Sequence, residues 1–117
     1  MVLREVLDLL DMKNSALEEF ILENERFLQR AQDNTTSLFD FQNFYTAREH
    51  ILAKINKIDA MIEKICGIHG YEFVDIEETR EHVIHRQKKK RQLVTKIIDQ
   101  DLVIMSMYAE RKTRVAK

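Results

Sequence analysis

Apolar residues recur along this chain at alternating spacings of three and four residues, the pattern of a coiled-coil seam. The seam of the first segment comprises Leu3, Val6, Leu10, Lys13, Leu17, Phe20, Asn24, Phe27 and Ala31. Leu7, Ile21 and Leu28 widen this stripe on one side. A stripe wider than a two-stranded zipper needs indicates a helix packed between two or more neighbours.

The same spacing continues through two further segments. The second seam comprises Phe41, Phe44, Arg48, Ile51, Ile55, Ile58, Ile62 and Ile65, flanked by Tyr45 and Leu52. The third comprises Ile76, Arg80, Val83, Gln87, Lys90, Val94, Ile97, Asp101, Ile104, Tyr108, Arg111 and Val115. With no proline and two glycines, the chain is also poor in the residues that make tight β-turns. We therefore predict an all-α fold in a single domain over 1–117, an antiparallel bundle of three long helices at about 2–33, 37–66 and 75–115 with coiled-coil-like packing.

Polar residues and glycines predict where these helices begin and end. Ser37 followed by Asp40 predicts an N-cap, Gly67 predicts a left-handed C-cap, and Asp75 predicts the cap of the third helix. The block HRQKKKRQ at 85–92 spans more than two turns without an apolar residue. Because such a block buries little apolar area, we expect the third helix to project, hinge or fray there.

Charge is unevenly distributed although the net charge is −1. Residues 1–33 contain four basic and eight acidic residues, whereas residues 68–117 contain eleven basic and eight acidic ones. The opposite signs favour packing of the first helix near the third. The near-neutral total argues against a dedicated nucleic-acid binder. A single cysteine, acids within the first turns and the lack of long apolar runs predict a cytoplasmic protein without membrane insertion.

The sequence gives only weak support for a metal site or a catalytic group. Glu78, His82 and His85 share a helix face but lack a fourth ligand, and Cys66 with His69 is half a site. Cys66 has no evident base beside it and is expected to be an apolar filler. Two glycines cannot form a glycine-rich phosphate loop. We expect no metal, no cofactor and no enzymatic activity.

Arg48 interrupts an apolar seam and therefore needs a partner. Glu18, Glu23 or Glu25 of the first helix could supply one in a register-setting ion pair. The alternative is a small all-helical enzyme of the chorismate-mutase-like type, which would bind a dianionic ligand through Arg48 and Arg80.

The basic block could contact phosphates, and its cations are Arg86, Lys88, Lys89, Lys90 and Arg91. It lacks the interleaved aromatic residues of single-strand binders. A solvated helix face is the preferred interpretation, and a nucleic-acid-associated helical protein is the alternative.

The most informative feature is a surplus of apolar residues on the last helix. Leu102 and Val103 fall at heptad positions that a three-helix bundle leaves in water. The predicted partner-binding residues are Val94, Ile98, Leu102, Val103, Met105, Met107, Tyr108 and Phe39. Two interpretations stay open, a groove for an amphipathic partner helix, or burial of the surplus by homodimerisation or by folding back on the bundle.

Three segments carry a family resemblance: a polar break QDNTTSLFDF, a helix REHILAKINKIDAMIEKI and an apolar last segment LVTKIIDQDLVIMSMYAERK. The chain resembles the small flagellar export chaperones of the FlgN and FliT type, which act in type III secretion. The resemblance implies a cytoplasmic protein that holds the C-terminal segment of a secreted filament-, hook- or cap-associated subunit. It also implies client binding through residues 94–108 and docking of Tyr108 at an export-gate protein. The heavy polar block at 85–92 departs from the family pattern.

Overall fold

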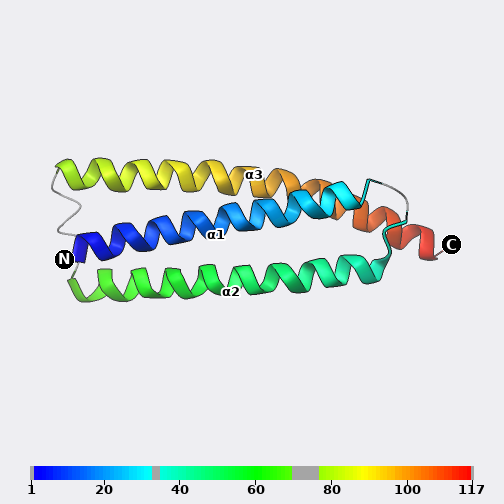
Figure 1. Ribbon diagram of the computed structural model, residues 1–117, viewed down its shortest axis with the longest axis horizontal. Helices are drawn as coiled ribbons and strands as arrows, with labels where there is room; N and C mark the ends of the chain where they lie inside the picture. Colours follow the sequence, from blue (N-terminus) through cyan, green and yellow to red (C-terminus); the bar gives the residue numbers. More distant parts are fainter. Residues whose placement is uncertain (1, 33–34, 70–76, 117) are drawn as a thin grey trace.

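The computed structural model describes residues 2–32, 35–69 and 77–116 of the chain. It contains helices α1 (Val2–Arg30), α2 (Leu38–His69) and α3 (Glu77–Ala116), and no strand among the described residues. The helices lie lengthwise in a bundle of 60 × 21 × 18 Å, with α2 antiparallel to α1 and α3 (Figure 1). The prediction of an all-α antiparallel bundle is confirmed.

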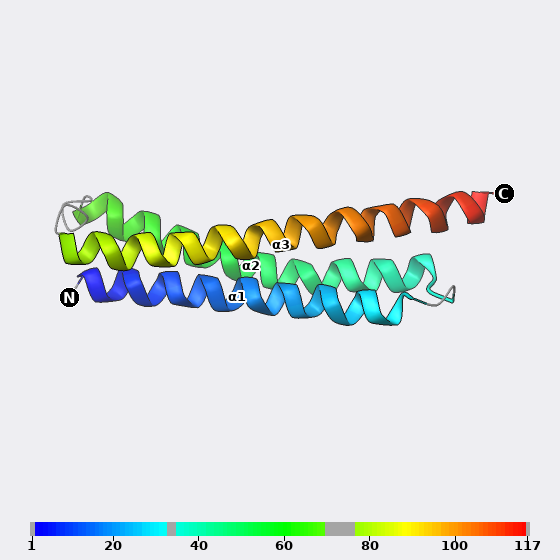
Figure 2. The same cartoon turned by 90° about the horizontal axis from the view of Figure 1, so that it is seen from above.

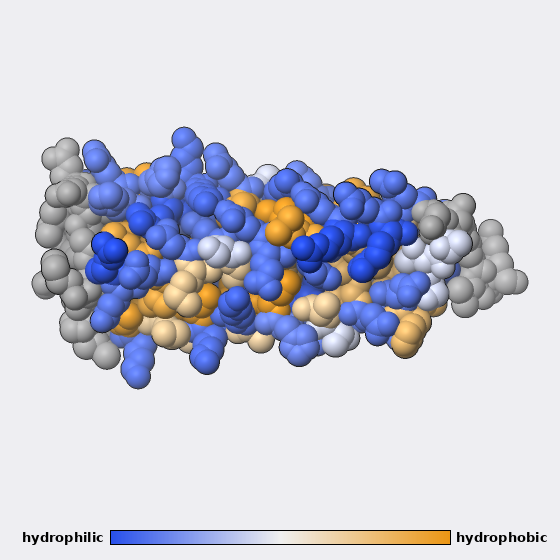
Figure 3. All heavy atoms as spheres, in the orientation of Figure 1, coloured by the Kyte–Doolittle hydropathy of each residue, from blue (hydrophilic) through white to orange (hydrophobic). Residues whose placement is uncertain are grey.

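Helix α1 is the central element of the bundle. It packs along both α2 and α3, whereas α2 and α3 have far fewer contacts with each other. Figure 1 shows the first part of α1 between α2 and α3 and its end overlapping α3, and Figures 1 and 2 both show the last turns of α3 extending past the ends of the other helices. On the face across which α1 runs, Figure 3 shows mainly hydrophilic side chains with apolar ones grouped in patches. The seam between α2 and α3 is therefore the least closely packed of the three.

Two apolar clusters join the three helices. One contains Ala16, Leu17, Phe20, Ile51 and Ile55, with Leu93 and Ile97 packed against it. The other contains Phe27, Ala31, Phe41, Phe44 and Ile104, with Leu28, Tyr45, Met107 and Tyr108 packed against it. The rings of Phe27 and Phe44 stack with centroids 4.1 Å apart. These buried side chains confirm the first two seams predicted from the spacing. In the third seam Ile97, Ile104 and Tyr108 pack inward, but Arg80 and Val94 are exposed, so the prediction is wrong at those two positions.

The helix ends agree with the sequence at one cap and differ at another. The Ser37 backbone N–H donates to Asp40 Oδ2 at 2.9 Å, and the Asp40 N–H donates to Ser37 Oγ at 3.2 Å, a reciprocal capping box. The prediction of a C-cap at Gly67 is wrong, because α2 continues through Gly67 to His69. A glycine inside a helix costs only about 1 kcal/mol relative to alanine, which packing elsewhere can offset. Asp75 lies outside the described residues.

The predicted interruption of the third helix is also wrong, because α3 is continuous through the polar block. Arg86 forms a bidentate ion pair with Asp11 of α1, with Nε–Oδ1 at 2.8 Å and Nη2–Oδ2 at 3.2 Å. Lys89 Nζ lies 3.0 Å from Glu18 Oε1, and Asn14 Nδ2 donates to the Arg86 carbonyl at 3.2 Å. Polar contacts thus attach this part of α3 to α1, and the predicted proximity of the first and third helices is confirmed.

Candidate functional site

Arg48 forms an ion pair with a residue that the sequence reasoning did not consider. Its Nη1 lies 2.8 Å from Asp101 Oδ1, and its Nη2 donates to Asp101 Oδ2 at 3.2 Å. The predicted partner on α1 is therefore wrong, since Asp101 belongs to α3. Glu18 and Glu25 of α1 are instead paired with Lys89 and Lys96 of α3. Arg48 therefore links α2 directly to α3, two helices that have few other contacts with each other.

Aromatic rings surround the Arg48 guanidinium. Its central carbon lies 4.4 Å from the ring centroid of Phe20, 5.2 Å from that of Phe44 and 5.6 Å from that of Tyr45. The Arg48 side chain is 11% exposed and that of Asp101 is 31% exposed. An ion pair in such partly desolvated surroundings, with one charge-assisted hydrogen bond from Arg48 Nη2 to Asp101 Oδ2, is stronger than a surface ion pair. The geometry fits a structural anchor between α2 and α3.

The two arginines of the chorismate-mutase-like alternative do not meet. Arg80 is exposed, near the start of α3, and Arg48 pairs with Asp101. Twenty-one residues of helix separate positions 80 and 101, which corresponds to about 30 Å along the helix axis. A small dianion cannot contact both arginines, so the structure does not assemble that ligand site.

Two tyrosines lie beside the ion pair. Their rings, Tyr45 and Tyr108, are in a T-shaped arrangement with centroids 6.1 Å apart, and Tyr108 also contacts Phe41 at 5.4 Å. Burial raises the pKa of the Tyr45 phenol, and the nearby Arg48 cation opposes this rise while Asp101 and Tyr108 add to it. Tyr108, the predicted docking residue, is half-buried and packs on the core.

The eight predicted partner-binding residues divide into groups. Five are exposed on α3, namely Val94, Ile98, Leu102, Val103 and Met105, and Phe39 of α2 is 67% exposed. Met107 and Tyr108 are half-buried against the second core cluster.

Four of the exposed residues on α3 share one flank. Val94, Ile98, Leu102 and Met105 follow one another at spacings of four, four and three, which keeps their side chains on one side of a helix. Val103 is five residues from Ile98 and is therefore rotated by about 140° from it. Phe39 is likewise rotated by about 120° around α2 from Tyr45, which faces α3. The structure therefore does not place Val103 and Phe39 with the other four.

Leu52 joins this group although the sequence reasoning placed it at the edge of the core. It is 42% exposed and follows Arg48 by one helical turn, so it lies on the side of α2 that faces α3. Leu102 follows Asp101 directly, and Ile98 precedes it by three residues. We call Leu52, Val94, Ile98, Leu102 and Met105 the apolar strip. It borders the α2–α3 seam on the side away from α1.

The cations of the basic block have different surroundings. Arg86 and Lys89 are paired with acids of α1. Lys88, Lys90 and Arg91 have no ion-pair partner among the described residues. Two hollows lie beside them. One of about 560 Å³ is lined by Lys88, Arg91, Gln92 and Thr95, and one of about 400 Å³ by Lys13, Lys90, Arg91, Val94 and Thr95. Lys90 and Arg91 therefore meet the apolar strip at Val94.

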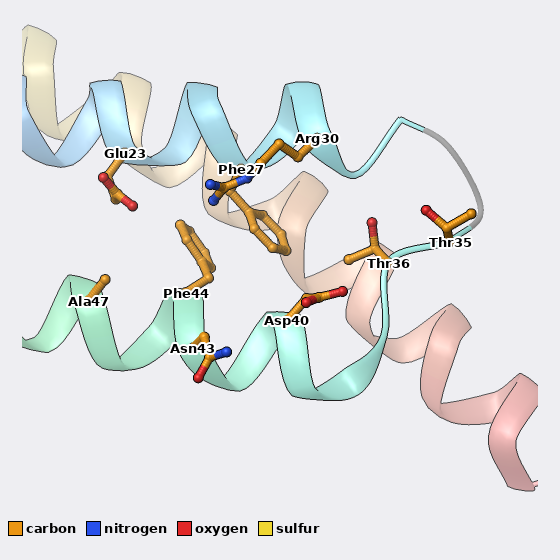
Figure 4. A pocket seen from close by; sticks show the side chains of 9 residues that line it. All are labelled: Glu23, Phe27, Arg30, Thr35, Thr36, Asp40, Asn43, Phe44 and Ala47. Atoms are coloured by element: carbon orange, nitrogen blue, oxygen red, sulfur yellow. The ribbon is translucent and has the colours of Figure 1, made fainter.

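A separate hollow of about 460 Å³ lies between the end of α1 and the start of α2 (Figure 4). Its lining is Glu23, Phe27, Arg30, Thr35, Thr36, Asp40, Asn43, Phe44 and Ala47. Figure 4 shows the two phenyl rings between the helices, with Glu23 and Arg30 on α1 and Asp40 and Asn43 on α2. Asp40 already accepts the Ser37 N–H of the capping box. The polar groups are of both signs and do not define one ligand charge.

The candidate metal ligands are not assembled in the part of the chain that can be described. His82 and His85 are both exposed, and the side chains of Glu78 and His69 lie outside the described part. Across that part, no three His, Cys, Asp or Glu side chains are placed to hold a metal ion. Cys66 is a free thiol, 4% exposed, which agrees with its predicted role as an apolar filler.

Comparisons with known proteins identify no relative. No family model matches the chain, and no curated protein and no solved structure matches it. Within the described residues, none of the three helices carries an apolar run long enough to cross a bilayer.

Proposed function

We propose that this protein is a non-enzymatic adaptor that binds a helical segment of another protein along the α2–α3 side of its bundle. The observation that carries the proposal is the apolar strip. Within it, Leu102 is 63% exposed, Met105 61% and Ile98 54%. Exposed apolar side chains grouped in this way along the α2–α3 seam, on its side away from α1, are typical of a protein-binding surface.

The strip has the geometry that an amphipathic helix needs. Its residues on α3 repeat at helical spacing, and Leu52 offers a second wall from α2. A partner helix lying along α2 and α3 would complete a four-helix arrangement, which is a common way to bury such a stripe. Full burial of one leucine or isoleucine side chain contributes at most about 1.5–3 kcal/mol. Methionine adds a side chain that adapts to different partners.

The resemblance to flagellar export chaperones gives this adaptor a specific role. In that role the protein stays in the cytoplasm and holds the C-terminal segment of a secreted filament-, hook- or cap-associated subunit until an export-gate protein receives it. The support is the place of the strip, because its four residues on α3 fall within the segment 94–108 that the resemblance assigns to client binding.

The test compares the wild type with Ile98→Asp/Leu102→Asp and with Leu22→Asp. Leu22 is 49% exposed on α1, so its substitution adds a surface charge without touching the strip. Binding to peptides that cover the C-terminal segments of flagellar hook- and cap-associated subunits is measured by fluorescence anisotropy, and helicity by circular dichroism. We expect the wild type and Leu22→Asp to bind alike, and the strip variant to remain helical but bind at least about tenfold more weakly.

Two results would reject the proposal. Equal binding by the strip variant and the wild type would show that clients dock elsewhere. A wild type that is dimeric in sedimentation, binds no peptide and becomes monomeric in the strip variant would assign the strip to a homodimer interface.

A further inference from the structure

The basic block contains two kinds of cation, distinguished by what they face. Arg86 and Lys89 are neutralised by Asp11 and Glu18 of α1. Lys88, Lys90 and Arg91 have no such partner among residues 2–32, 35–69 and 77–116. The pairing that attaches α3 to α1 therefore accounts for only part of the block.

Two of the unpaired cations continue the line of the apolar strip. Arg91 precedes Val94 by three residues and Ile98 by seven, which places its side chain within about 60° of both around α3. Lys88 precedes Arg91 by three residues and Leu102 by fourteen, which places it within about 60° of both. Arg91 and Val94 line the same hollow of about 400 Å³, together with Lys90. The flank thus changes from basic to apolar without a gap, in the direction from Lys88 to Met105.

Resting on the proposed function, we infer that the partner helix has a cluster of carboxylates at one end of its apolar face, and that these carboxylates lie against Lys88 and Arg91. Opposite charges at one end of an apolar interface fix the register and direction of the bound helix, because only one alignment satisfies both. The seventeen residues from position 88 to position 105 span about 26 Å, so the partner helix needs about 18 residues.

Because the unpaired cations are continuous with the apolar strip, an acidic helix fits this surface better than a nucleic acid does. Phosphates would engage the cations but leave the adjoining apolar side chains in water, whereas an amphipathic helix covers both. Lys88, Lys90 and Arg91 are also spread along a single helix without aromatic side chains between them on which bases could stack.

The test uses designed helical peptides of about 21 residues with one leucine stripe. The first carries glutamates in its N-terminal two turns, the second carries them in its C-terminal two turns, and the third has glutamine in their place. Binding to the full chain is measured by fluorescence anisotropy at about 50 mM and about 500 mM NaCl, since surface charge effects weaken with salt.

The matched variants are Lys88→Glu/Arg91→Glu and Lys57→Glu/Lys64→Glu. The second pair makes the same change of charge at exposed lysines of α2, which form no ion pair with any residue that the structure describes. We expect one acidic peptide to bind at least about tenfold more tightly than the glutamine peptide at low salt. Lys88→Glu/Arg91→Glu should abolish this preference, and Lys57→Glu/Lys64→Glu should retain it.

The outcomes separate this inference from the proposed function. If all three peptides bind equally, lose binding with Ile98→Asp/Leu102→Asp and ignore the charge reversal, the apolar docking stands and the acidic cluster is wrong. If no peptide binds and the wild type is a dimer that the strip variant disrupts, both are wrong. Binding of a DNA or RNA oligonucleotide that is lost in Lys88→Glu/Arg91→Glu and unaffected by Ile98→Asp/Leu102→Asp would assign the cations to phosphates and overturn the inference.

Discussion

Replacing Arg48 with alanine should be among the most destabilising single changes in this chain. The substitution removes the contacts of 2.8 and 3.2 Å to Asp101 and leaves that carboxylate partly buried without its cation. Loss of one partner of a buried ion pair costs about 3–5 kcal/mol. Because Asp101 is 31% exposed, water can rehydrate it, and we take the lower end of that range. Loss of the guanidinium 4.4 Å from the Phe20 ring adds about 0.5–1 kcal/mol.

We therefore expect the free energy of unfolding to fall by about 3–4 kcal/mol, a large part of the 5–15 kcal/mol typical of a small domain. The measurement is urea denaturation followed by circular dichroism. Lys54→Ala is the matched control. It removes the ion pair between Lys54 Nζ and Glu19 Oε2, which are 3.4 Å apart, with both side chains more than half exposed. Such a surface pair should contribute less than about 1 kcal/mol.

A double-mutant cycle with Asp101→Ala tests the cause of the loss. If the pair acts as a unit, the double variant should lose much less than the sum of the two single losses, with a coupling of at least about 1 kcal/mol. The reasoning would be refuted if Arg48→Ala cost no more than Lys54→Ala, or if the losses from Arg48→Ala and Asp101→Ala were additive to within about 0.5 kcal/mol.

Two further predictions concern the buried polar groups. The pKa of Tyr45 is raised in the folded chain, so the unfolded chain loses the phenol proton first as the pH rises above about 10. The free energy of unfolding should therefore fall as the pH rises above this value, and it should fall less in Tyr45→Phe. The measurement is urea denaturation at stepwise pH. In the core, Asn24 Nδ2 donates to Gln100 Oε1 at 2.9 Å. Asn24→Leu leaves that buried oxygen without its donor and should lower the free energy of unfolding by about 1–3 kcal/mol in the same assay. Asn24→Leu/Gln100→Leu replaces both partners and should recover most of this loss. A double variant as unstable as Asn24→Leu would contradict the second prediction.

The fold was predictable because its main determinant is local. Spacings of three and four residues define a helical face whatever lies opposite, and Phe20, Phe41 and Ile104 are buried as their seam positions require. The capping box at Ser37 is equally local, since its hydrogen bonds span three residues. The sequence prediction differs at α3 because it treats a lack of apolar burial as a cause of local helix instability. Lysine, arginine and glutamine are good helix formers, and ion pairs to α1 replace the missing apolar contacts.

The partners across the bundle could not be predicted in the same way. Periodicity shows which face of a helix is inside, but it does not show how each helix is rotated or which neighbour lies at a given level. Gln100, one residue beside the predicted seam, is therefore only 9% exposed and donates to the Ile21 carbonyl at 3.4 Å. For the same reason Arg48 was assigned to an acid of α1 and not to Asp101. The apolar surplus was recognised from the sequence, but separating Leu102 from Val103 required the orientation of α3.

The ion pair and the apolar strip have a common structural cause. Helices α2 and α3 have few contacts with each other, and the ion pair between Arg48 and Asp101 joins them in place of more extensive apolar packing. Because a polar bond holds this seam, Leu52 and Leu102, which lie next to the pair along their helices, are not needed to close it and stay exposed. Stability and the proposed binding surface therefore depend on the same two helices. A partner that buries the strip should also shield the pair from water, so binding and the stability of the α2–α3 seam should increase together.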